Sequence, residues 1–318
     1  MSTLRLALAA GLAIALACYD GWAQSQRTVK FVIPFPPGGA ADIVARLVAE
    51  QFGRRPGLAT TVESRPGAGS VIGTEAVSRA APDGSTLLLP ANSFVINAIV
   101  RKLTYDPFSF EPICVLVRSP HVLTVNSASP YHTLADLLAA ARAQPGALSN
   151  ASVGPATAQH IAFEMLKRAA KVDMGFIPFS GNAPAVNALL GGHVTSVIVN
   201  YPEVAEQVKA GKLRALATTV GARIEEMPNV PTIAESGFSD FETETWIGLV
   251  APPKTPTDTI AQLASWTVAA LQAPDVRAKL VAVGLFPVGL CRADFTAYLR
   301  KQYDEYARVI HASNIKIE

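Results

Sequence analysis

Few residues in this chain are of the kinds that carry out chemistry. Only 16% of its 318 residues are charged, the formal net charge is +2, and there are three cysteines and five histidines. Without a run of lysine and arginine, binding to nucleic acid or to an anionic membrane surface is disfavoured. Neither His-x-x-x-His nor Cys-x-x-Cys occurs, and no Gly-x-Ser-x-Gly motif marks a nucleophile. We therefore expect no metal, no cofactor, no nucleic-acid partner and no catalysis.

A long apolar run occurs only at the amino terminus. Arg5 precedes the run Leu6–Ala17, which is shorter than the roughly 20 residues that a membrane span needs. This pattern predicts a signal peptide over residues 1–23, cut after Ala23, and hence export of the mature chain. A lipoprotein cut before Cys18 and an uncleaved membrane anchor are the alternatives.

The two cysteines that remain after cleavage are Cys114 and Cys291. An oxidising compartment permits them to pair, but pairing requires a short distance that sequence does not reveal. We predict two buried free thiols and leave the pairing open.

Strand and helix patterns alternate along most of the chain, which predicts an α/β fold with open sheets. The residues 86–89 are nearly all apolar, as expected of a strand covered on both faces. Two separate strands, 113–117 and 122–125, are expected around Pro120. Thr133 and Asp136 have the spacing of a helix-capping pair. In the last helix a packing face is expected from apolar residues at spacings of three and four, namely Phe295, Leu299, Tyr303, Tyr306 and Ile310.

Three expected strand-to-helix turns place glycine or small polar residues where a helix begins. They are the segments Pro34–Asp42, Ser152–His160 and Phe179–Pro184. The free N–H groups at a helix start bind anions well, and the carboxyl ends of strands are where α/β sheets bind ligands. The turns therefore indicate a site that holds a carboxylate.

Several polar residues near these turns have two interpretations. Asp42 either steadies its own turn or acts as a general base, and His160 is either structural or a ligand contact. Ser93 and Asn200 each follow an expected strand, so each either faces the ligand or satisfies the local backbone. The sequence alone does not decide between these roles.

Read together, the segments resemble the periplasmic receptors of tripartite tricarboxylate transporters, the Bug family. The resemblance spans the mature chain. It is carried by segments that include V-I-P-F-P-P-G-G-A-A-D-I-V-A-R, E-S-R-P-G-A-G-S-V-I-G, A-A-P-D-G-S-T-L-L, A-G-K-L-R-A-L-A-T-T and W-I-G-L-V-A-P, in this order. It implies a two-lobed, type II-like periplasmic-binding-protein fold that closes over a ligand crevice. The expected lobes are residues 24–120 with 250–318, and residues 121–249.

The resemblance also implies the ligand-binding residues. Backbone amides are expected to hold the ligand carboxylate, with side chains nearby. In the first lobe the expected positions are Phe35, Gly38, Gly39, Ala40, Ala41, Asp42 and Ser93. In the second lobe they are Ser152, Thr157, Ala158, His160, Asn182, Ala183 and Asn200.

The resulting hypothesis is a periplasmic, monomeric receptor for a small organic carboxylate. The acid is a di- or tricarboxylate, an aromatic acid, or an acidic or amide amino acid, and the partner is a pair of membrane transporter subunits. One alternative is a secreted hydrolase that uses Asp42 and His160. Another is a sensory receptor without transport, because both uses rely on the same closure.

Overall fold

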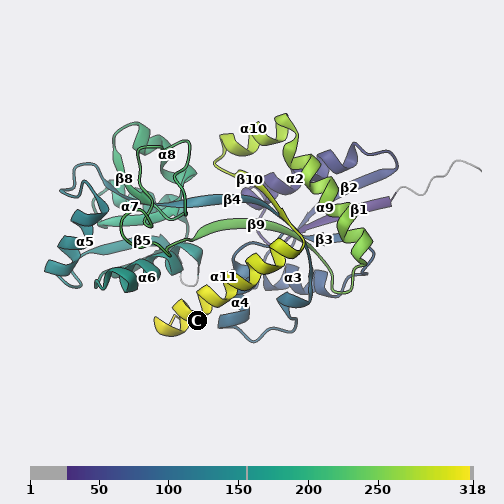
Figure 1. The fold of residues 1–318 in the computed structure, drawn as a ribbon, viewed down its shortest axis with the longest axis horizontal. Coiled ribbons are helices and arrows are strands. Elements are labelled where there is room, and N and C mark those ends of the chain that lie inside the picture. Colours follow the sequence, from purple (N-terminus) through teal and green to yellow (C-terminus); the bar gives the residue numbers. More distant parts are fainter. Residues whose placement is uncertain (1–26, 155–156, 316–318) are drawn as a thin grey trace, which may run out of the picture.

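The chain folds into two lobes joined by long strands (Figure 1). The computed structural model describes residues 27–154 and 157–315, so the expected signal peptide at residues 1–23 lies outside the described residues. The joining strands are β4 (Glu111–Asn126) and β9 (Glu244–Ala251). We call the lobe built on strands β1 to β3 lobe one, and the lobe built on strands β5 to β8 lobe two.

Lobe one is a mixed sheet with helices on both faces. Its strand order is β2 (Leu58–Ser64), β1 (Arg27–Ile33), β3 (Thr86–Leu88), β9 and β4, and β10 (Phe286–Cys291) pairs with β4. One face packs on α2 (Ala40–Gly53), α9 (Thr257–Gln272) and α10 (Pro274–Ala282). The other packs on α3 (Val71–Ser78), α4 (Ser93–Val100) and α11 (Ala293–Ala312). Short 3-10 turns lie at η1 (Ala68–Ser70) and η2 (Pro107–Ser109).

Burial on both faces explains the nearly continuous apolar strands. Successive side chains of a strand point to opposite faces of its sheet. Phe31 and Ile33 belong to the hydrophobic cluster beneath α2, whereas Val32 between them belongs to the cluster beneath α4 and α11. Leu87 and Leu88 divide in the same way. The prediction of a strand covered on both faces at residues 86–89 is thus confirmed, except that β3 ends at Leu88.

Lobe two repeats this arrangement on a smaller sheet. Its strands are the second half of β4 with β7 (Ser196–Asn200), β5 (Ser149–Val153), β6 (Gly175–Phe179) and β8 (Leu213–Thr218). The helices are α5 (Leu134–Ala143), α6 (Ala158–Ala170), α7 (Asn182–Leu190) and α8 (Pro202–Lys209). The predicted capping pair is present: Asp136 N donates to Thr133 Oγ1 at 3.1 Å, and Thr133 N donates to the Asp136 carboxylate at 2.9 Å.

The prediction of two strands around Pro120 was wrong, because β4 continues through this residue. Glu244 of β9 lies opposite Pro120, and Asn200 of β7 lies opposite the next residue, His121. Pro120 thus stands where β4 changes its partner, and its carbonyl accepts a hydrogen bond from Tyr201 N at 2.9 Å. Proline has no N–H to donate, which weakens a strand in the interior of a sheet. Where a strand changes from one partner strand to another, this loss is tolerated.

Helix α11 contacts both lobes. Phe295, Leu299, Tyr306 and Ile310 are buried on its inner face, which confirms the predicted packing surface. Near its carboxyl end, Arg168 Nη1 of α6 donates to Ala312 O at 3.1 Å.

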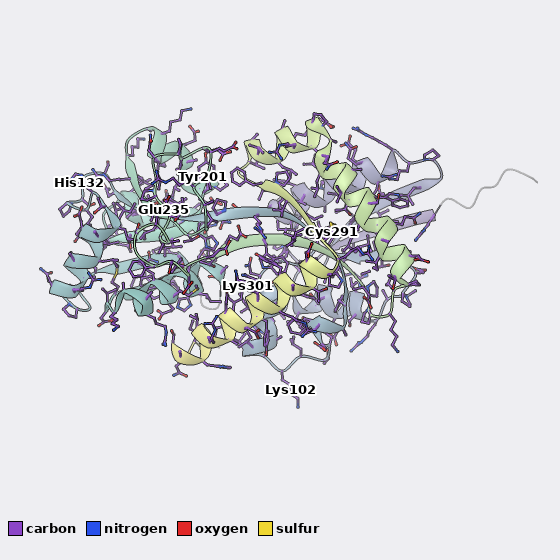
Figure 2. All side chains as sticks on the ribbon, in the orientation of Figure 1. Lys102, His132, Tyr201, Glu235, Cys291 and Lys301 are labelled. Atoms are coloured by element: carbon purple, nitrogen blue, oxygen red, sulfur yellow. A yellow bond between two sulfur atoms is a disulfide. The ribbon has the colours of Figure 1, made fainter. Side chains whose placement is uncertain are left out.

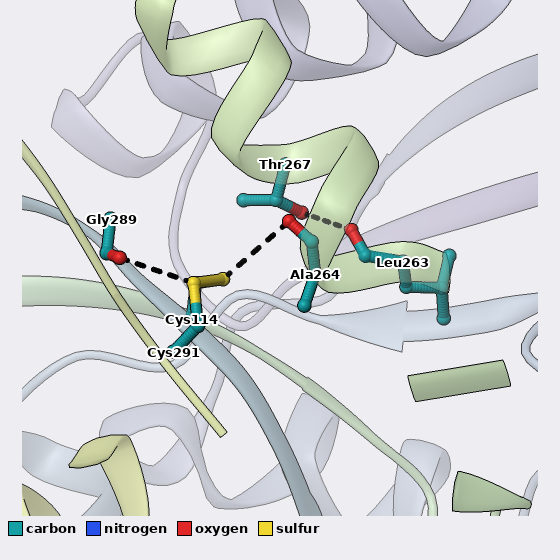
Figure 3. Close-up of a disulfide and its surroundings, with 6 residues drawn as sticks. All are labelled: Cys114, Leu263, Ala264, Thr267, Gly289 and Cys291. Atoms are coloured by element: carbon teal, nitrogen blue, oxygen red, sulfur yellow. Dashed lines mark hydrogen bonds between the residues drawn. A yellow bond between two sulfur atoms is a disulfide. The ribbon is translucent and has the colours of Figure 1, made fainter. Parts of the chain in front are cut away.

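Cys114 and Cys291 form a disulfide, which corrects the prediction of free thiols. They lie opposite each other where β10 pairs antiparallel with β4 (Figure 3). Their sulfurs also lie near carbonyl oxygens, 4.0 Å from Ala264 and 3.2 Å from Gly289 respectively. The bridge joins residues 177 positions apart, so all of lobe two lies within the loop that it closes.

The lobes also touch at the start of α8. Tyr201 lies on the side of lobe two that faces lobe one (Figure 2), and its ring is 6.2 Å from the ring of Phe286. Gly284 comes so close that a Cβ added there would stand 2.3 Å from Pro202 Cγ. Only glycine fits this position.

Candidate functional site

The first predicted turn of lobe one is built around the Asp42 carboxylate. Oδ2 accepts hydrogen bonds from Gly38 N and Arg46 Nε, each at 3.0 Å, and Oδ1 pairs with an Arg46 amino group at 3.0 Å. The Arg46 hydrogen bond, helped by Gly38 N and opposed by burial, lowers the pKa of Asp42 below its ordinary value. A carboxylate occupied in this way steadies its turn and is not set up as a general base.

The start of α2 leaves backbone donors available. Gly39 is the residue that precedes the helix, and its carbonyl accepts from Asp42 N at 3.0 Å and Ile43 N at 3.1 Å. The amides of Ala40 and Ala41 have no acceptor among the described residues. Both residues follow β1, at the carboxyl end of the lobe-one sheet, and Ala40 is exposed.

The other two predicted residues of lobe one have different surroundings. Phe35 is half-buried and packs against the cluster beneath α2. Ser93, at the first position of α4, shares a 2.8 Å hydrogen bond with Ser70 Oγ. Asn97 Nδ2 donates to Gly69 O at 2.7 Å, so η1 is held against α4 at this point.

The second predicted turn uses its polar side chains internally. Thr157 Oγ1 donates to Val153 O at 2.8 Å and accepts from His160 N at 3.3 Å, which makes Thr157 the cap of α6. Ser152 is buried, and its hydroxyl contacts Val153 O at 3.3 Å. The amide of Ala158 has no acceptor among residues 27–154 and 157–315, so this turn too offers a backbone donor.

His160 is an aromatic packing residue as well as a polar one. Its ring stacks on Phe176 with centroids 3.8 Å apart, and Nε2 lies 3.9 Å from Glu164 Oε1. Burial lowers the pKa of His160 to about 4, and the Glu164 charge only partly opposes this. The imidazole is therefore neutral near pH 7.

The third turn lies beside the second. Gly154 N donates to Phe179 O at 3.1 Å, which ties the ends of β5 and β6 together. Asn182 Nδ2 contacts Glu203 Oε1 at 3.4 Å, and the buried Asn182 Oδ1 has no partner in the part of the chain that the structure describes. Ala183 is exposed at the start of α7.

Asn200 is the last residue of β7, and two side chains from other elements donate hydrogen bonds to it. Its Oδ1 accepts from Gln159 Nε2 and from Thr245 Oγ1, each at 3.0 Å. Thr245 Oγ1 also lies 3.0 Å from His121 Nε2. This group links lobe two to the joining strands β4 and β9.

The predicted residues thus fall into two sets, one at the carboxyl end of each sheet. Within the described residues, no hydrogen bond or ion pair joins the first turn to the lobe-two set, and Asp42 is not bonded to His160. Packing does connect Ser93 to lobe two, because its neighbour Phe94 shares a buried cluster with Ile161 of α6. Asp42 and His160 are therefore not paired with each other in this structure.

Sequence reasoning missed Gln159, Thr245 and His121. Gln159 lies inside the second predicted turn, next to His160. The position of Gln159 in that turn was the one available signal, because Thr245 is the second residue of an ordinary strand and His121 has no metal-ligand spacing. The described residues contain no group of three or more His, Cys, Asp and Glu arranged to hold a metal ion. Across the same residues, no helix is both long and apolar enough to traverse a bilayer.

Comparison with known proteins decides the family. The family described as "Tripartite tricarboxylate transporter family receptor" matches residues 44–315. The chain belongs to this receptor family. The periplasmic binding protein BugD is 31% identical, with a TM-score of 0.74 over 92% of this chain and 99% of BugD. The two-lobed fold expected from the sequence is therefore confirmed.

Two further solved structures of similar fold contain carboxylic acids. A protein of R. palustris solved with adipate is 29% identical, with a TM-score of 0.77 over 93% of this chain and 99% of the other. MatC from Rhodopseudomonas palustris, with bound malate, is 29% identical, with a TM-score of 0.72 over 89% of this receptor and 99% of MatC. This chain is thus a member of a family of solute-binding receptors.

Proposed function

We propose that this receptor binds a small organic carboxylate in the periplasm and delivers it to a tripartite tricarboxylate-type transporter. The observation that carries the proposal is the pair of helix starts, α2 in lobe one and α6 in lobe two, whose first amides have no acceptor among the described residues. Helix-start amides carry partial positive charge, so they replace the water around a carboxylate at little cost.

The acid class follows from the same amides and from the family. Dicarboxylates such as malate and adipate are the first candidates, because related receptors were solved with them. Tricarboxylates, aromatic acids and acidic or amide amino acids present the same group to the amides. The proposed ligand-binding set is the one predicted from the sequence, with Asp42 and Thr157 acting through their turns and not by direct contact.

Transport follows closure of the lobes over the acid. Ligand contacts that exist only in the closed form shift the population toward it, and the membrane subunits then recognise that shape. We place the receptor in the periplasm as a monomer after removal of residues 1–23.

A test of the proposal measures thermal stabilisation by a panel of organic acids. An acid at 100 times its dissociation constant should stabilise the fold by about 2.7 kcal/mol. If malate, adipate, citrate, benzoate, aspartate and asparagine all leave the melting temperature unchanged, the proposed function is wrong.

A proline variant tests the amides directly. Ala40 is the first residue of α2, and Gly39 before it is extended (φ −83°, ψ 179°), so Ala40→Pro removes one N–H without disturbing the helix. Loss of one charge-assisted hydrogen bond should weaken acid binding by about 10- to 100-fold.

The matched control is Thr257→Pro at the first position of α9. The preceding residue there is also extended (φ −57°, ψ 141°), and this helix carries none of the predicted ligand residues. Thr257→Pro should bind the acid as tightly as the unmodified receptor. Equal affinities for all three proteins would remove the Ala40 amide from the site.

A further inference from the structure

The amide oxygen of Asn200 is fully used by the protein. It accepts two hydrogen bonds of 3.0 Å, from Gln159 Nε2 and from Thr245 Oγ1. An amide oxygen has two lone pairs, so both are occupied. No group among the described residues accepts from Nδ2 of the same amide. The Nδ2 donors of Asn200 therefore remain available to a ligand, whereas its Oδ1 acceptor does not.

The surroundings determine which end of the Asn200 amide faces outward. Gln159 is 7% exposed, and His121, behind Thr245, is 0% exposed, whereas Asn200 itself is partly exposed. Oδ1 thus points toward buried partners. The NH₂ group lies in the same amide plane as Oδ1 but points in a different direction, and it is the end that a bound molecule can meet.

His121 sets the direction of the hydrogen bonds. The ring is fully buried, and burial lowers its pKa to about 3, so the imidazole is neutral and carries one N–H. Nε2 lies 3.0 Å from Thr245 Oγ1, while Nδ1 has no partner within the described part of the chain. A buried lone pair without a partner costs less than a buried N–H without one. The proton therefore belongs on Nε2, which donates to Thr245, and the Thr245 hydroxyl is left to donate to Asn200.

We propose that Gln159, Thr245 and His121 are positioning residues that hold the Asn200 amide with its NH₂ group toward the ligand. The inference rests on the proposed function, and it makes Asn200 a specificity-determining residue. A donor in that position favours a carboxylate oxygen and disfavours the NH₂ end of a carboxamide. The backbone amides of the turns add to the same preference.

The first experiment needs no ligand. Long-range proton–nitrogen NMR of the His121 ring should show the Nε2–H form, with an unprotonated Nδ1, between pH 5 and 9. A proton on Nδ1 would reverse the Thr245 hydrogen bond and overturn the inference, whether or not any acid binds.

The second experiment is a double-mutant cycle read by the affinity for malate or adipate. Asn200→Ala should weaken binding by about 10- to 100-fold, the range expected for one charge-assisted hydrogen bond. Thr245→Val should weaken it several-fold, because the amide is then free to turn, and Gln159→Met should do the same. Thr245→Ser keeps the hydroxyl and should bind normally.

Two results distinguish positioning from a general structural role. In the Asn200→Ala background, Thr245→Val should have no further effect on affinity, because its action passes through Asn200. Thr245→Val should also reduce the ratio of the affinity for malate to the affinity for its monoamide. Additive losses, or an unchanged preference, would overturn the inference while leaving carboxylate binding intact. If neither malate nor adipate binds the unmodified receptor, the dicarboxylate proposal fails, and the His121 spectrum alone decides the orientation.

Discussion

Reduction of the disulfide is the perturbation whose size the structure fixes best. Cys114 and Cys291 close a loop of 177 residues (Figure 3). In the chain-entropy description a loop of this length restricts the unfolded chain enough to stabilise the native state by about 5 kcal/mol. Reduction leaves both sulfurs in place, so it removes the constraint without leaving a cavity. For a chain of this size, 5 kcal/mol corresponds to a fall in melting temperature of about 8 °C.

Urea unfolding of the oxidised and reduced receptor measures the effect. The midpoint should fall on reduction, and the dependence of the unfolding free energy on urea should steepen, because the unfolded chain expands when the loop opens. Cys114→Ala/Cys291→Ala should resemble the reduced protein with a small added loss from the buried Cys114 site. Equal midpoints for oxidised and reduced protein, with full reduction verified by mass, would refute the loop argument. Malate affinity should not change, since no predicted ligand residue touches the bridge.

Three other perturbations have expected outcomes. Burial raises the pKa of Glu244 to about 7, so this carboxyl ionises at lower pH in the unfolded chain than in the native protein. The free energy of unfolding should therefore fall by about 3 kcal/mol between pH 4.5 and 7. Urea titrations at several pH values should show this fall, and Glu244→Gln should remove it. Gly284→Ala should lower the melting temperature and weaken acid binding, because the added Cβ would collide with Pro202. Gly211 is the control, since it also has a positive φ (+70°) but a Cβ added there would meet no atom within 4 Å. Gly211→Ala should lower stability by only about 1 kcal/mol. Asp42→Ala should destabilise the fold by about 1.5 kcal/mol and weaken binding through its turn, as calorimetry can measure.

Local patterns predicted what local interactions determine. Three kinds of local feature could be predicted from the sequence: the Thr133 cap, the inner face of α11 and the helix starts at the first two turns. Each of them depends on residues within a few positions of one another. The same holds for the alternation of strands and helices. The two-lobed fold came from the ordered family segments and not from any one motif.

Contacts between distant segments were not predictable. The disulfide depends on β10 pairing with β4, and β10 itself carries no clear strand pattern, with Pro287 and Gly289 inside it. The continuity of β4 through Pro120 depends on partners from both lobes. The two partners of Asn200 come from α6 and β9, and His121, which contacts Thr245, comes from β4, so no spacing in the sequence brings these residues together.

The joining strands concentrate buried polar groups that a rigid core would exclude. Arg118 of β4 lies 2.9 Å from Glu244 Oε1 of β9, although its Nε–H does not point along that line, and its guanidinium stands 4.9 Å from the ring of Tyr298. Of this pair only Glu244 is buried, whereas the Arg118 side chain is 28% exposed. Thr245, one residue beyond Glu244, donates to the proposed ligand-binding Asn200. Because Glu244 and Thr245 are consecutive residues of β9, a change in the register or twist of this strand would alter the Arg118 contact and the orientation of the Asn200 amide together.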